Sequence, residues 1–178
     1  DEAEEELISE GEEQPLSFIS NAGLILLAPF LPRLFSMLQL TENGVFKDRD
    51  AKIRAIFLMQ YAVFSTTEFP EYELQLNKLL VGFKTGVPLP RAVELTEEEM
   101  KTTDGMLQGV VQHWNKVKTI DGLREGFLQR EGKLDDAGEV IELIVETKAF
   151  DMLLDAVPWN FRTTKFSWME KTIQVKWR

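Results

Sequence analysis

The chain contains no cysteine among its 178 residues. This absence excludes disulfide bonds, thiolate metal sites and cysteine nucleophiles, and it leaves the redox compartment undetermined. Any chemistry of the protein must therefore rest on other side chains.

Histidine is nearly absent as well, since His113 is the only one. A general base or metal ligand on a helix would profit from an acidic neighbour three or four residues later, but those positions hold Lys116 and Val117. His113 lies beside Trp114 near an expected helix end, where a cation interacts favourably with the last carbonyl groups. We expect a capping or surface role for His113 rather than catalysis.

No hydrophobic run is long enough for a transmembrane helix. The longest run surrounds Leu24, is interrupted by Pro29 and Pro32 and closes at Arg33, whereas a bilayer needs about 20 apolar residues. The first residues are acidic where a signal peptide needs a basic start. We therefore expect a soluble protein without membrane insertion.

Basic residues are missing from the first part of the chain. Asp1–Glu13 contains eight acids and no Lys or Arg, so it repels itself and can bury little apolar surface. We predict a disordered acidic linker over residues 1–14 and one globular domain over residues 15–178. A second interpretation, an acidic arm that docks on a basic partner, stays open. Because the chain begins at Asp1 rather than Met, we expect it to be part of a longer protein.

The rest of the chain is almost neutral, with 22 acidic and 20 basic residues. Nucleic-acid binding needs a basic field that displaces counterions, so we expect no nucleic-acid partner. The apolar content of 44% is enough for a substantial core.

Two pairs of acidic residues are candidates for catalytic carboxylates. Asp151 and Asp155 are four residues apart on an expected helix, and Glu142 and Glu146 could share a strand face. A glycosidase needs two carboxylates that line one cleft, which exposed pairs do not provide. Residues 135–139 superficially resemble a calcium loop but lack its alternating oxygen ligands. We predict no catalytic residue, no cofactor and no metal site.

Helical signals occupy most of the chain up to residue 130. Thr96 and Glu99 form a capping box that starts one helix, and Asp48 or Asp50 can cap another. Further helices are expected over Pro29–Gln39, after a bend at Ala28, and over Pro70–Phe83, Ile120–Arg130 and Lys148–Ala156.

Two glycines interrupt the helix that begins near Thr96. Gly105 and Gly109 each cost about 1 kcal/mol relative to alanine. Their spacing of four places both on one side of the helix, where a neighbouring backbone could approach closely.

Strand signals gather after residue 132. The turn over residues 135–138 separates two segments and predicts a hairpin. Phe161–Phe166 and Ile173–Trp177 indicate two further strands, the second with strict alternation of apolar and polar residues. The predicted fold class is α+β, a mainly helical single domain with a small antiparallel sheet or hairpin near the C-terminus.

Large aromatic and basic residues cluster in the last twenty positions. Tryptophan is a frequent hot-spot residue in interfaces, although these tryptophans could equally be the core of the small sheet. The basic residues could be ordinary exposed residues of a hairpin. The predicted partner-binding residues are Trp159, Trp168, Trp177, Lys171 and Lys176.

Several apolar segments occur in a characteristic order. The segment Phe18–Phe35 resembles the signature of the contractile injection system tape measure protein family, which belongs to phage-tail-like particles. The resemblance continues, in the same order, to residue 177. It includes the segments Leu76–Leu80, Glu94–Glu99, Gly122–Gly132 and Asp151–Asp155.

This resemblance implies a structural rather than an enzymatic function. Members of the family help to set the length of the inner tube, so the expected partners are tube and baseplate proteins of a particle assembled in the bacterial cytoplasm. This chain would be a globular part that anchors the ruler. A homo-oligomer is left open. The residues alone support a second hypothesis equally well, a free-standing adaptor domain that binds one protein partner.

Overall fold

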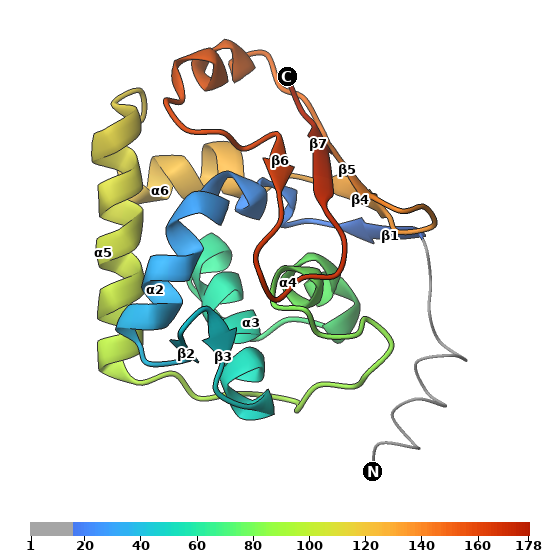
Figure 1. Ribbon diagram of the computed structural model, residues 1–178. Coiled ribbons are helices and arrows are strands. Elements are labelled where there is room, and N and C mark those ends of the chain that lie inside the picture. Colours follow the sequence, from blue (N-terminus) through green and yellow to red (C-terminus); the bar gives the residue numbers. More distant parts are fainter. Residues whose placement is uncertain (1–15) are drawn as a thin grey trace.

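The structure is a computed structural model that describes residues 16–178 (Figure 1). The predicted acidic linker over residues 1–14 lies outside the described residues. The α-helices are α2 (Leu31–Met37), α3 (Arg49–Phe64), α4 (Gln75–Leu80), α5 (Glu97–Trp114) and α6 (Ile120–Leu123). Shorter helical elements are η1 (Ala22–Phe30), η2 (Glu71–Leu74), η3 (Arg124–Leu128) and η4 (Asp151–Ala156). The strands are β1 (Leu16–Ile19), β2 (Thr41–Glu42), β3 (Val45–Phe46), β4 (Gly132–Asp135), β5 (Ile141–Val145), β6 (Thr163–Thr164) and β7 (Ile173–Lys176).

Five strands form one mixed sheet in the order β1-β4-β5-β7-β6. The α+β class is therefore confirmed, with 46% of the described residues helical. The prediction of an antiparallel sheet is wrong, because β5 and β7 run parallel. The chain leaves β5, passes through η4 and β6, and returns beside β5 in its original direction.

The sheet is also not confined to the C-terminal part of the chain. Its edge strand β1 comes from the start of the described residues and pairs with β4. The sequence signal for β1 was hidden because Phe18 and Ile19 lead directly into the apolar segment of η1. The predicted hairpin of β4 and β5 is confirmed, as is the antiparallel pair of β6 and β7.

One face of the sheet packs on the helices and the other faces outward. Leu134 of β4 pairs with Leu143 of β5, and both are buried. On the outward face, Phe18 pairs with Lys133, and Phe18 is 70% exposed. The helices therefore cover only one side of the sheet (Figure 1).

The proline-containing segment forms two consecutive helical elements. The residues of η1 from Ala22 to Ala28 are all buried, so η1 lies in the centre of the core. Pro29 lies inside η1, and α2 begins at Leu31 with Pro32 in its first turn. The boundary between the two helical elements lies at Leu31 rather than at Ala28, and Pro32 falls in the first turn of α2, where proline is tolerated.

A glycine in η1, Gly23, allows its backbone to lie very close to that of η3. A Cβ atom at Gly23 would lie 1.8 Å from the carbonyl oxygen of Phe127 in η3. Only glycine allows the two backbones to approach in this way.

Helix α3 lies between the other helices and is buried around most of its circumference. Asp48 caps this helix, since its carboxylate accepts a hydrogen bond from the Ala51 amide at 2.8 Å. This confirms the prediction that either Asp48 or Asp50 is the cap. The capping box of α5 is also confirmed, since Thr96 and Glu99 each accept a bond from the other's backbone amide. These local signals place the helix starts correctly because they depend on only four residues.

Candidate functional site

The interior contains a buried ion pair between Arg130 and Asp151. Arg130 follows η3 and Asp151 begins η4, and their side chains are 0% and 2% exposed. The guanidinium binds the carboxylate with both Nη atoms, at 2.9 Å and 2.5 Å. Such bidentate contacts are among the stronger hydrogen bonds in proteins.

The remaining donors of Arg130 bind backbone carbonyls. Nε and Nη2 donate to Gly126 at 3.0 and 2.8 Å, and Nη1 also donates to Glu146 at 2.9 Å. All five N–H groups of the guanidinium therefore have acceptors. The Gly126 carbonyl is available because η3 is a π-helical turn and the Arg130 amide bonds to Leu128 instead.

Aromatic rings enclose this ion pair. The guanidinium carbon lies 5.4 Å from the ring centres of Phe127, Phe150 and Trp177. Trp177 also donates its indole N–H to Asp151 at 3.2 Å. The cluster thus joins η3, the end of β5, η4 and the C-terminus around one arginine.

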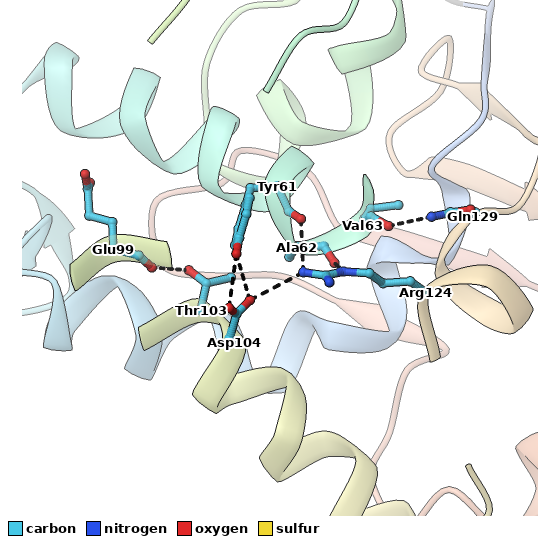
Figure 2. Close-up of polar contacts among 8 residues, drawn as sticks. All are labelled: Tyr61, Ala62, Val63, Glu99, Thr103, Asp104, Arg124 and Gln129. Atoms are coloured by element: carbon cyan, nitrogen blue, oxygen red, sulfur yellow. Dashed lines mark hydrogen bonds and ion pairs between the residues drawn. The ribbon is translucent and has the colours of Figure 1, made fainter. Parts of the chain in front are cut away.

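A second polar cluster closes the C-terminal end of α3 (Figure 2). Arg124 of η3 donates to the carbonyl of Ala62, and Gln129 donates to that of Val63, both at 2.9 Å. Tyr61 donates its hydroxyl to Asp104 of α5 at 2.9 Å. Burial, together with the bond to Asp104, raises the pKa of the Tyr61 phenol. These contacts satisfy carbonyl groups that a helix end leaves without partners.

The structure does not bring Asp151 and Asp155 together into one site. Asp151 is buried on Arg130, whereas Asp155 is exposed and pairs with Arg178 at 3.1 Å. Glu142 binds Lys176 on the outward face of the sheet at 2.9 Å. Within residues 16–178, no three His, Asp or Glu side chains are grouped to hold a metal ion.

All four tryptophans donate their indole N–H groups to partners inside the molecule. Trp114 donates to Leu153 and Trp159 to Leu26, each at 2.9 Å, and Trp168 donates to Leu80 at 2.8 Å. Trp177 is 4% exposed and donates to Asp151. Each ring therefore attaches one part of the chain to another.

The predicted partner-binding residues do not form one cluster. Trp177 is in the core, while Trp159 and Trp168 are partly buried in separate aromatic groups around Phe30 and Phe46. The lysines are on the surface, where Lys171 pairs with Asp136 at 2.7 Å and Lys176 pairs with Glu142. The exposed side chain of Lys176 is the most accessible of the five, at 65%.

A surface groove runs between α5 and the segment that ends η1 and forms α2. Its volume is about 630 Å³. Arg33 and Lys101 line it together with His113, whose ring stacks on Trp159 at 5.7 Å. His113 occupies the last turn of α5 and is exposed. Sequence reasoning missed this groove and also missed the burial of Arg130, since no local pattern marks either.

Comparison with known proteins was made at the level of families, curated proteins and solved structures. The family model described as contractile injection system tape measure protein matches residues 1–177. The chain belongs to this family. No significant match was found among curated proteins or solved structures.

The tape measure family is structural, and the interior of this member agrees with a packing role for its polar clusters. No helix formed by residues 16–178 has both the length and the apolar character that crossing a membrane requires.

The buried ion pair predicts unequal effects of two aspartate substitutions. Asp151→Asn leaves the Arg130 guanidinium buried without a counter-charge, so the free energy of unfolding should fall by about 3–5 kcal/mol. Asp155→Asn removes a similar pair that is exposed to solvent, and its effect should be small. Urea unfolding of both variants measures the difference, and equal losses would contradict the role assigned to Arg130.

Acid should weaken the same cluster. Burial alone would raise the pKa of the Asp151 carboxyl, but hydrogen bonds from Arg130, Lys148 and Trp177 outweigh it and hold the pKa below its usual value. Because the folded pKa is the lower one, the unfolded chain binds the proton more readily, and stability falls as pH falls. This contribution is complete above about pH 5, begins to fall near the ordinary carboxyl pKa of about 4, and is lost only as pH drops through the lower folded pKa. In urea titrations from pH 7 to pH 3, wild type should therefore lose more stability than Asp151→Asn; equal losses would show that Asp151 titrates normally.

Proposed function

We propose that this chain is a globular module of a tape measure protein, which anchors the length-setting part of that protein to the tube or baseplate. One observation carries this proposal. The longest helix among the described residues is α5, with 18 residues, which corresponds to about 27 Å. The described part is folded around one hydrophobic cluster that runs from Ile19 to Trp177. A ruler must be extended, so this part suits attachment rather than measurement.

The proposed module acts through binding and not through catalysis. Its partners are tube and baseplate proteins of the same particle, and its assembly takes place in the bacterial cytoplasm. Nucleic acid and membrane have no part in this proposal, and a ring of several copies around the tube axis is compatible with it. The near-neutral charge of residues 14–178 supports protein partners.

The C-terminal aromatic and basic residues remain a proposed contact surface. Its rigidity would come from the internal indole hydrogen bonds of Trp159, Trp168 and Trp177. Lys171 and Lys176 would face the partner. Their acidic neighbours Asp136 and Glu142 would then compete with the partner for the same ammonium groups.

Deletion of residues 14–178 from the full-length protein tests the anchoring function. We expect the deletion to abolish tube assembly, because the ruler would no longer be attached. Electron microscopy of particles from producing cells gives the yield and the length distribution. The control is Asp155→Asn in the same full-length protein, which should leave both unchanged. Normal particles of normal length after the deletion would contradict the proposal.

A further inference from the structure

The groove between α2 and α5 lies on the surface of the molecule. Its apolar lining comes from both walls, and Met37 at its edge is 58% exposed. A contiguous apolar surface of several residues, unlike a single exposed side chain, indicates an interaction site. The apolar residues that line the groove are Pro29, Phe30, Leu34, Met37 and Met106.

The two glycines of α5 line the same groove. A Cβ atom at Gly105 or Gly109 would meet nothing within 4 Å. Each glycine weakens the helix by about 1 kcal/mol relative to alanine, and no close packing within the described residues requires either one. They leave the helix backbone accessible to a neighbour from outside.

The charged residues that line the groove have one sign. Arg33 and Lys101 line it, and neither forms an ion pair within the described part of the chain. No Asp or Glu is among the lining residues. An occupant with carboxylates would complement these cations.

The helical walls of the groove restrict the backbone conformation that a bound segment can have. Both walls are helical, and their peptide groups already bond within the helices. The groove therefore offers no strand edge to an extended peptide. A bound α-helix fits this groove, because its backbone N–H and C=O groups form hydrogen bonds within the helix itself.

We propose that this groove binds an acidic amphipathic α-helix of a tube or baseplate protein. This inference rests on the proposed function and names the partner's chemistry. The helix would place an apolar stripe on Met37, Met106 and the two glycines, and carboxylates beside Arg33 and Lys101. The chain's own acidic segment, residues 1–13, has only Ala3, Leu7 and Ile8 as apolar side chains, too few to cover the groove.

Photocrosslinking in assembled particles tests the proposal. The full-length protein would carry benzoylphenylalanine at Thr102, which lines the groove, or as a control at Gln174, which is exposed on the sheet. We expect Thr102 to crosslink to a helical segment of a tube or baseplate protein with acidic residues beside an apolar stripe, and Gln174 not to do so. Crosslinks to residues 1–13, to a second copy of the chain or to nothing would overturn the proposal.

A charge-reversal variant gives the matched control. Arg33→Glu combined with Lys101→Glu should lower the crosslink yield from Thr102 about tenfold, whereas Arg33→Lys combined with Lys101→Arg should retain it. Both variants should unfold within about 3 °C of wild type, because the changed side chains are exposed. An unchanged yield in the reversed variant would refute the charge complementarity. If the deletion of residues 14–178 still abolishes assembly, the anchoring function stands even though this groove is not its contact.

Discussion

The ion pair between Arg130 and Asp151 is the constraint on which the arrangement of the C-terminal half depends. A buried charge is costly unless it is paired and its hydrogen bonds are satisfied. Here the five donors of Arg130 reach their acceptors only if η3, the end of β5 and η4 meet at one point. Trp177 brings the C-terminus to the same point. The parallel return of β7 beside β5 is thus coupled to the position of one guanidinium.

Polar groups that are bonded inside the molecule are not available to bind partners. The four indole N–H groups are all used internally, so the aromatic residues hold elements together. Lys78 likewise donates to the carbonyls of Thr85 and Val87 and is 1% exposed. By contrast, the groove between α2 and α5 combines exposed Met37 with cations that have no acidic neighbour in the lining. We expect a structural component of a particle to combine a rigid interior with a few surfaces that contact its partners.

The sequence could predict features that depend on neighbouring residues. The cap at Asp48, the capping box at Thr96 and the hairpin of β4 and β5 are of this kind. It could not predict contacts between distant segments. Lys78 lies within the predicted helix Pro70–Phe83 and Arg130 ends the predicted helix Ile120–Arg130, and neither position indicates burial, yet both side chains are buried. The parallel pairing of β5 with β7 and the groove were missed for the same reason, since each is made by elements far apart in the chain.

A double-mutant cycle at Arg130 and Asp151 tests the central claim most directly. Arg130→Met and Asp151→Leu each leave one charge buried and should strongly lower the free energy of unfolding. The double variant leaves no charge and should recover much of that loss. Guanidinium unfolding of the four proteins, monitored by tryptophan fluorescence, provides the comparison. Recovery in the double variant is the result that this account predicts. Losses that simply add would contradict it, because they would show that the two side chains stabilise the fold independently.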